Sequence, residues 1–469
     1  MSHRLFHRFL LTLLICVGQA TISAGQEKPD VLFIAVDDLN DWTGHLKGHP
    51  QAKTPNIDRL VSKGVLFTNA HCVAPACNPS RAGLMSGLRP WSTGIYTNGD
   101  PAQSVLKETL TLNRHLQSCG YVVKGGGKIY HGFASEGRKD TWDDWRGLFP
   151  GASGKELNLN GLNKSHFDWG PIDARTDEMS DHKLTDWAIE TLQKDPLDKP
   201  LFLAVGYVKP HLPWYVPREY FDRFPLESIQ LPKVNANDLD DVPPAGVRMA
   251  KPSGDHAAVV EAGQWKNAVQ GYLATIAFLD DEVGRLLVGL ESSPRAKKTI
   301  VVWWTDHGWH LGEKEHWRKF ALWEEATRTS FAISVPGVTK PNQICAAPVD
   351  YLSVYPTLCD LLSLDRPKHV QGPSLMTLLK NPSAAWDQVA ICTHGRGNHA
   401  VRDSRYRYIR YSNGDEELYD HQADPYEWQN LASQSQFSEI KQRLESHLPK
   451  AKQEAAPTAK GSDKAEESE

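Results

Sequence analysis

Val31-Leu32-Phe33-Ile34-Ala35-Val36, followed at once by Asp37-Asp38, is the stretch that decides the fold of this chain. A continuous apolar run without alternation is typical of a parallel β-strand that is covered on both faces. Such a strand needs helices on either side of its sheet. The stretch therefore predicts a buried central strand with two carboxylates at its carboxyl end.

Further apolar runs repeat this pattern along the chain, at residues 120–124, 201–207, 299–305 and 331–335. Amphipathic helical segments separate them, most clearly at 181–193 and 265–290. Strands that alternate with helices predict an α/β fold, with a large doubly wound, mixed but mostly parallel sheet flanked by helices. In such sheets ligands gather at the carboxyl ends of the strands, so residues that directly follow strands are the candidates for a site.

The pattern of apolar and polar residues changes after about residue 385. Short alternating segments at 400–402, 406–410 and 417–420 predict an antiparallel sheet, with a helix packed on it near 436–448. Residues 231–255 are rich in Pro, Asp and Gly and predict a long surface loop. We expect a catalytic domain at 26–385, a smaller C-terminal α+β subdomain at 386–449 and a disordered tail at 450–469.

Composition excludes several classes of protein. Among the 469 residues, 40% are apolar and 23% charged, as in ordinary soluble globular proteins, and the net charge of −5 argues against nucleic-acid binding. Residues 9–17 form an apolar run after His3, Arg4, His7 and Arg8, too short to span a bilayer. It predicts a signal peptide at 1–25, a secreted or periplasmic protein and no stable membrane insertion. The pairing of the six cysteines after Cys16 stays open.

Cys77-Asn78-Pro79-Ser80-Arg81 is the first motif that carries chemistry. Pro79 suits the first position of a helix, so the sequence predicts a helix over residues 80–85. Cys77 then lies beside free backbone N–H groups and the positive end of the helix dipole, a place that favours a sulfate or phosphate group. The alternative is a structural cysteine buried under the helix.

Acidic residues follow two of the predicted strands: Asp37 and Asp38 the first, and Asp306-His307 the strand at 299–305. Carboxylates crowded at buried strand ends repel each other unless a cation or several donors compensate them. Three carboxylates suit a hard divalent ion, with calcium preferred to magnesium in a roomy cage. His307 is unusual beside such an ion and by itself would suggest zinc. The alternative is that each aspartate caps a local turn.

Basic residues lie in loops that follow the other strands: Lys128, His131, Lys209, His211 and Lys319. If these loops converge at the carboxyl ends of the strands, fixed cations beside a single metal ion form a pocket for an oxyanion. The alternative for any one of them is a solvated loop side chain.

The Cys-x-Pro-Ser-Arg motif resembles the maturation signature of the formylglycine-dependent sulfatases of the alkaline phosphatase superfamily. The resemblance extends over nearly the whole mature chain and is closest to the iduronate-2-sulfatase type. It implies that a formylglycine-generating or sulfatase-maturating enzyme oxidises Cys77 to formylglycine (3-oxoalanine). It also implies one Ca²⁺, held by Asp37, Asp38, Asp306, His307 and the modified Cys77.

The same resemblance implies roles for the other residues. Arg81 matches the arginine that orients the aldehyde hydrate, and Trp309 matches an aromatic residue of the substrate pocket. Lys128, His131, His211 and Lys319 match the sulfate-binding and proton-transfer set. The expected function is hydrolysis of sulfate esters of acidic sugars, by exo action on sulfated glycosaminoglycan or similar polysaccharide fragments. A phosphodiester or phosphonate monoester hydrolase, and a non-catalytic sugar-binding protein with unmodified Cys77, stay as alternatives.

Overall fold

The computed structural model describes residues 28–132, 141–152, 157–450 and 454–456. The predicted signal peptide lies outside these residues, as does most of the predicted tail, and the domain limits stay predictions. Within that tail, the backbone N–H of Ala456 donates to the carbonyl of Gly94. Among the described helices, none has the length and apolar character needed to cross a bilayer.

An eight-stranded sheet forms the centre of the molecule, in the order β13-β2-β12-β9-β1-β7-β4-β5. The strand β1 runs parallel to both of its neighbours, β9 and β7, and β4 and β5 continue the parallel part. The strand β12 runs antiparallel to β9 and β2. The predicted mixed, mostly parallel sheet is therefore confirmed. Its strands are β1 (Asp30–Val36), β2 (Val65–Phe67), β4 (Val122–Gly127), β5 (Asp144–Trp145), β7 (Leu201–Tyr207), β9 (Thr299–Thr305), β12 (Phe331–Ser334) and β13 (Gln343–Cys345).

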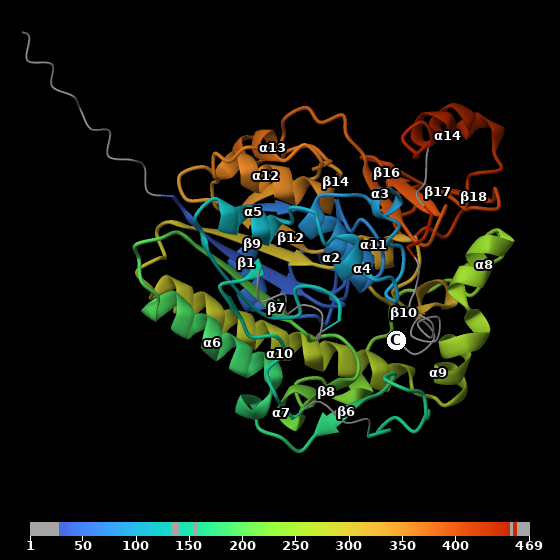
Figure 1. The fold of residues 1–469 in the computed structure, drawn as a ribbon. Coiled ribbons are helices and arrows are strands. Elements are labelled where there is room, and N and C mark those ends of the chain that lie inside the picture. The colour runs from blue at the N-terminus through green and yellow to red at the C-terminus, as the bar shows by residue number, and fades with distance from the viewer. Residues whose placement is uncertain (1–27, 133–140, 153–156, 451–453, 457–469) are drawn as a thin grey trace, which may run out of the picture.

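Helices cover both faces of this sheet (Figure 1). Leu32, Ile34 and Val36 of β1 belong to the core shared with α6 (Ser180–Lys194) and α10 (Trp265–Glu291). The alternate residues Val31 and Phe33 belong to the opposite core, with α2 (Cys77–Ser86), α5 (Leu112–Ser118) and α12 (Val354–Leu361). Full burial of each large apolar side chain contributes about 1.5–3 kcal/mol, which is why β1 is apolar from Val31 to Val36.

Smaller elements surround this framework. The other helices are α1 (Pro55–Val61), α3 (Pro90–Thr93), α4 (Ala102–Val105), α7 (Arg218–Phe221), α8 (Pro244–Ala250), α9 (Ala257–Glu261), α11 (Glu324–Thr327) and α13 (Met376–Lys380), with η4 (Pro252–His256) as one turn of π-helix. Three two-stranded sheets pair β3 (Ala70–His71) with β14 (Val349–Asp350), β6 (Trp169–Ile172) with β8 (Trp214–Pro217), and β10 (His310–Leu311) with β11 (Trp317–Arg318).

The C-terminal part forms a four-stranded antiparallel sheet, as predicted, with α14 (Ser438–Glu445) near it. Its strands are β15 (Ala390–Thr393), β16 (His399–Arg402), β17 (Tyr406–Arg410) and β18 (Glu416–Asp420). The sequence pattern did not predict β15. Buried Arg407 of β17 joins this sheet to the larger part, because its guanidinium pairs with Glu324 of the larger part as well as with Glu427 of the C-terminal part.

Two other local predictions were wrong. The helix after the cysteine motif begins at Cys77 and not at Pro79, since a proline is tolerated anywhere in a first turn, where backbone N–H groups have no intrahelical acceptor. The segment 231–255, predicted as a loop, contains α8 and most of η4. Pro244 opens α8 at its first position, and Lys251 ends it in the left-handed conformation, with φ of 52°.

Candidate active site

The predicted site residues meet at one edge of the central sheet. Four adjacent parallel strands end there, and a functional side chain follows each of them: Asp306 follows β9, Asp37 follows β1, His211 lies beyond β7 and Lys128 follows β4. This is the position at which open α/β sheets bind ligands. Lys319 reaches the same place from the segment after β11.

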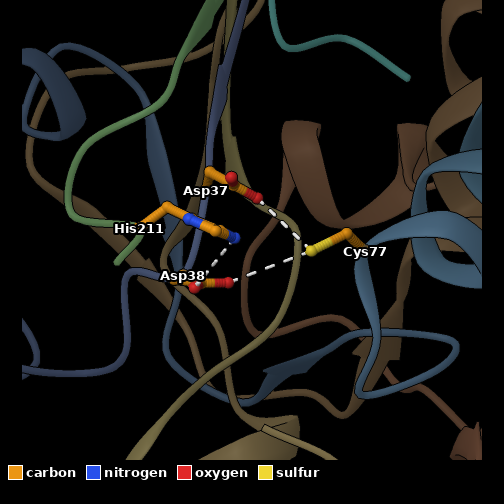
Figure 2. A group of neighbouring side chains, drawn as sticks. All are labelled: Asp37, Asp38, Cys77 and His211. Carbon is orange, nitrogen blue, oxygen red and sulfur yellow. Dashed lines mark hydrogen bonds and ion pairs between the residues drawn. The ribbon is translucent and has the colours of Figure 1, made fainter. Parts of the chain in front are cut away.

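Cys77 is the first residue of α2 and is fully buried. Its Sγ lies 3.5 Å from Asp37 Oδ1, 3.3 Å from His307 Nε2 and 3.2 Å from Lys319 Nζ. Figure 2 shows the thiol facing both Asp37 and Asp38, with His211 on the far side of the two carboxylates. The cysteine thus lies at the centre of the site.

The Cys77 thiol is a poor nucleophile in this environment. Burial raises the pKa of this thiol well above its usual range, although the charges of Lys128 and Lys319 act to lower it. Because the thiolate and not the thiol is nucleophilic, an unmodified cysteine here stays neutral and inert. The position suits a side chain that cysteine chemistry alone does not provide.

Arg81 organises the acidic side of the site from one helical turn beyond Cys77. Its Nε donates to Asp306 Oδ2 at 2.9 Å and its NH2 donates to Asp37 Oδ1 at 3.0 Å, with all three side chains fully buried. A further guanidinium N–H donates to the carbonyl of Lys128. One side chain therefore holds the ends of three strands together. The planar guanidinium can do this because its N–H donors point in several fixed directions, whereas a lysine ammonium is a compact point charge.

The donor set fits a divalent cation. Two overlapping groups of ligand atoms lie within 4.8 Å of one another, one of Asp37, Asp38, Cys77 and His211 and one of Asp38, Cys77, Asp306 and His307. Three buried carboxylates provide the oxygen atoms that a hard ion prefers. The pKa of Asp38 is raised to about 7, chiefly by burial and also by the nearby Asp37 and Asp306 charges, although Lys319 acts to lower it. A cation would relieve this crowding of negative charge.

Three cations balance the three carboxylates. Besides Arg81, Lys128 pairs with Asp37, and Lys319 Nζ lies 3.1 Å from Asp38 Oδ1. Burial disfavours the charged form of Lys128, but Asp37 raises its pKa overall. A divalent ion added to this balanced set makes the site positive, and an anionic ester is then the substrate that the field attracts.

His211 faces the site from the loop after β7. Its Nε2 lies 3.8 Å from Asp38 Oδ2, while its Nδ1 contacts the carbonyl of Leu212 at 2.5 Å. Burial, followed by the charge of Lys128, lowers its pKa well below the usual range. Lys209 supports the same loop, since its Nζ donates to the carbonyl of Pro213. The buried Asp181 carboxylate accepts the backbone N–H of Lys209 at 2.8 Å.

The surroundings of two further predicted site residues are also defined. His131 lines a cavity, together with Asn78, Tyr130 and Trp142. Trp309 is only 1% exposed and packs in the core beneath Lys319, whose Nζ lies 5.5 Å from the centre of the ring. The expected roles of both residues in proton transfer and substrate binding stay predictions.

Sequence patterns missed one residue that shapes the site. Tyr272 of α10 donates its hydroxyl to the carbonyl of Asp38 at 2.6 Å and accepts the N–H of Asn40 at 2.9 Å. These bonds support Asp38 in the left-handed conformation, with φ of 62°, which a non-glycine residue rarely adopts. Nothing in the periodicity of a long amphipathic helix distinguishes this tyrosine from a core residue.

Fold and site together are those of an α/β enzyme that acts on anionic esters. The sulfatase family model matches residues 29–364, and a model for the C-terminal part of N-sulphoglucosamine sulphohydrolase matches residues 312–454. The chain therefore belongs to the sulfatase family and is a sulfuric ester hydrolase, which confirms the resemblance drawn from its motifs.

Similar proteins include a sulfatase of Formosa agariphila, 38% identical over 94% of this chain and 92% of the relative. Human iduronate 2-sulfatase is 29% identical over 77% of this chain and 74% of its own length. Among solved structures, a protein bound to D-glucosamine-2-N,6-O-disulfate aligns with a TM-score of 0.74 at 21% identity, over 90% of this chain and 96% of the other. The phosphonate monoester hydrolase of Agrobacterium radiobacter aligns with a TM-score of 0.75 at 21% identity, over 89% and 94%. At these identities the two structures establish the fold alone.

Proposed function

We propose that this chain is a secreted or periplasmic, calcium-dependent sulfatase that removes sulfate from acidic sugars through a formylglycine made from Cys77. The substrate we propose is of the kind that iduronate-2-sulfatases act on: a terminal sulfated unit of a glycosaminoglycan or similar polysaccharide fragment. The similarity to human iduronate 2-sulfatase supports this substrate class. The observation that carries the proposal is the position of Cys77, where two lysines, a histidine and carboxylates from two strands surround one helix N-terminus.

The aldehyde hydrate of formylglycine would supply one oxygen to attack sulfur and a second to expel the sulfate, while calcium would lower the pKa of the attacking hydroxyl. Asp37, Asp38, Asp306 and His307 would hold the ion. Arg81 fixes two of these carboxylates and thereby orients residue 77. Lys128 and Lys319 lie close enough to residue 77 to bind the sulfuryl oxygens as charge develops on them.

His211 is the side chain we assign to protonation of the leaving sugar oxygen, together with Lys319. Its Nε2 faces Asp38, and its Nδ1 is fixed by a backbone carbonyl, so the ring has one orientation. Burial favours the neutral form of this ring, and the negative charge of a bound sulfate ester would favour the protonated form that donates. His131 is assigned to removal of the second proton of the hydrate, and Trp309 to the substrate pocket, on resemblance alone. The fully buried Cys77 also implies that the maturating enzyme acts before the chain has finished folding.

Peptide mass spectrometry across Cys77, in protein from its native host, tests the modification. We expect the cysteine mass to be replaced by that of formylglycine, and an unmodified thiol throughout would favour a sugar-binding protein without activity. The fold shared with a phosphonate monoester hydrolase motivates the second candidate function. Turnover of an aryl sulfate, an aryl phosphodiester and a phenylphosphonate monoester, compared at equal concentration, decides between the two, and a preference for either phosphorus ester would contradict a sulfatase.

A further inference from the structure

A cleft of about 510 Å³ lies beside the site, and its lining comes from three parts of the chain together with the single residue Thr97. One wall is α8 with Lys251, the floor is the segment around Arg318 and Phe320, and the other wall comes from the loops of the C-terminal sheet. Figure 1 shows α8 next to that sheet, on the same side of the molecule as β10. None of the residues assigned above to the metal ion or to the sulfate lines this cleft.

The cleft adjoins the nucleophile through backbone connections. Lys319, whose Nζ lies 3.2 Å from Cys77 Sγ, stands between the two floor residues Arg318 and Phe320. The N–H of Phe320 donates to the carbonyl of Pro75 at 3.0 Å, and the lining residue Thr97 accepts a hydrogen bond from Asn78 at 3.0 Å. Lys319 and the floor of the cleft therefore belong to one short segment, which places the cleft near the site.

Backbone strain marks the same surface. Arg318, Phe320 and Lys251 all adopt the left-handed conformation, with φ of 74°, 67° and 52°. Each such residue costs free energy, on the order of 1–3 kcal/mol, and strained residues concentrate at functional sites. Three of them in the lining of one cleft point to a surface that is shaped for a ligand.

Two cations in the lining are exposed and form no close ion pair among the described residues, although a hydrogen bond with Asn413 and then the charge of Arg248 lower the pKa of the Asp415 carboxyl. Arg318 Nε pairs with Asp255 Oδ2 at 2.7 Å, and Asp255, the acidic residue of this lining, also pairs with Lys164 at 2.8 Å. Arg248 and Lys251 are exposed, and no carboxylate within the described ranges forms an ion pair with either. The cleft therefore presents two exposed cations, free of close ion pairs, to a ligand.

The wall that carries Arg248 and Lys251 is held at both ends. The N–H of Ala245 donates to Asp415 Oδ2 at 3.0 Å, and the carbonyl of Ala250 lies 2.8 Å from His316 Nδ1. A Cβ at Gly246 would lie 2.5 Å from Glu417 Oε1, so only glycine permits this close packing of α8 on the C-terminal sheet. The two cations project from a fixed surface, which lowers the entropic cost of binding.

We propose that this cleft binds the sugar unit next to the sulfated one, and that Arg248 and Lys251 pair with a negatively charged group, carboxylate or sulfate, on that unit. This inference rests on the proposed function and extends it, because it makes the enzyme selective for a charged oligosaccharide over a single sulfated sugar. Asn398, Ser412 and Asn413 line the facing wall and offer hydrogen bonds to sugar hydroxyls.

The test is the double variant R248A/K251A in the full-length, matured protein. Its kcat/KM is compared on an aryl sulfate and on pairs of disaccharides that share the sulfated terminal unit. In one pair the second unit carries or lacks a sulfate, and in the other it carries a carboxylate or its reduced alcohol. We expect about a tenfold loss on the charged member of at least one pair, mainly through KM, and no change on the aryl sulfate. The pair affected identifies the recognised group.

Two controls accompany this variant. K297A/K380A removes two exposed lysines that lie outside the cleft lining and should leave every substrate unchanged. R248K/K251R keeps both charges and should retain most of the selectivity. Equal losses on all substrates, or no loss on any, would overturn the inference while leaving the sulfatase proposal in place. If the wild-type protein turns over no sulfate ester at all, the proposed function fails, and the inference with it.

Discussion

At the scale of single residues, the proposed chemistry depends on the conversion of Cys77 to formylglycine. We expect Cys77→Ala to reduce turnover of an aryl sulfate by a factor of about 10³ or more, since removal of a covalent nucleophile leaves only binding and charge stabilisation. Cys77→Ser should be equally slow at steady state, because a serine ester lacks the second hydroxyl that expels sulfate. Steady-state rates and the intact mass of each variant after exposure to substrate provide the measurement.

Folding of these variants serves as the control. Loss of one buried sulfur should lower the free energy of unfolding by no more than about 2 kcal/mol, so both proteins should keep their circular dichroism spectrum. An alanine variant that retains wild-type turnover would contradict the proposed nucleophile. Covalently bound sulfate on the serine variant would support it.

The second prediction at this scale concerns the metal ion. Dialysis against a chelator should abolish activity, and Ca²⁺ should restore it better than Zn²⁺, because three of the proposed ligands are carboxylates. Asp306→Asn, which removes a charge that Arg81 also contacts, should weaken the apparent calcium affinity by at least tenfold. Metal analysis of the purified protein and calcium titrations of its activity provide the measurement. Two zinc ions per chain would contradict the proposal.

Most of the site could be predicted because parallel strands end at one edge of a sheet. Asp37, Lys128, His211 and Asp306 each follow a recognisable apolar run, so their meeting follows from topology. The cavity that His131 lines could not be predicted, because its lining comes from separate segments that no sequence pattern places together. The support that Tyr272 gives to Asp38 is likewise a contact between distant segments.

At the scale of elements, the close approach of β7 to the end of β4 determines where Lys128 lies. The N–H of Lys128 donates to the carbonyl of Gly206 at 2.7 Å, and a Cβ at Gly206 would lie 2.4 Å from the Lys128 backbone. We expect Gly206→Ala to move Lys128 away from residue 77 and to lower kcat/KM at least tenfold. Gly120→Ala, at the other end of the same strand pair, meets open space and should lose stability but not activity.

Kinetics together with thermal unfolding distinguish these two substitutions. The prediction fails if both variants lose activity in proportion to their loss of stability, because Gly206 would then act through folding alone.

The elements that sequence patterns predicted well are those with long apolar runs. The limits of β7 and β9 agree with the predicted strands at both ends, and α6 and α10 agree within one residue at each end. The strand β4 extends instead to Gly127, through three glycines that periodicity does not mark as a strand. Trp142 and Trp145 pack directly over Gly125, which explains why a small residue is needed there.

At the scale of the whole molecule, the C-terminal sheet completes the cleft beside the site and must stay docked for that cleft to exist. The guanidinium of Arg407 makes several of the polar contacts that hold the sheet in place. Its Nε lies 2.6 Å from Glu427 Oε1, its NH2 pairs with Glu324, and its NH1 donates to the carbonyl of Leu322 at 3.1 Å. Sequence patterns could identify the sheet but not its attachment, since these partners come from separate segments.

We expect Arg407→Ala to destabilise the protein by about 3–5 kcal/mol at pH 7, because it removes the closest cation from two largely buried carboxylates and leaves them only Arg402 and His421 as ion-pair partners. Burial acts to raise the pKa of Glu324, but His421 and Arg407 hold it well below its usual range, and Arg407 also lowers the pKa of Glu427. Carboxylates whose pKa is lowered by folding stabilise the protein above their unfolded pKa, about 4.3, and that stabilisation is lost as the pH falls through the folded pKa. The difference in free energy of unfolding between wild type and variant should therefore be largest near neutrality and smaller below about pH 4.

Urea unfolding at pH 7 and pH 4 measures this difference. Arg410→Ala serves as the control, since the part-exposed Arg410–Glu416 pair should contribute less than about 1 kcal/mol. A difference that is equal at both pH values, or no larger than that of the control, would mean that the C-terminal sheet is held by apolar packing and not by this buried guanidinium.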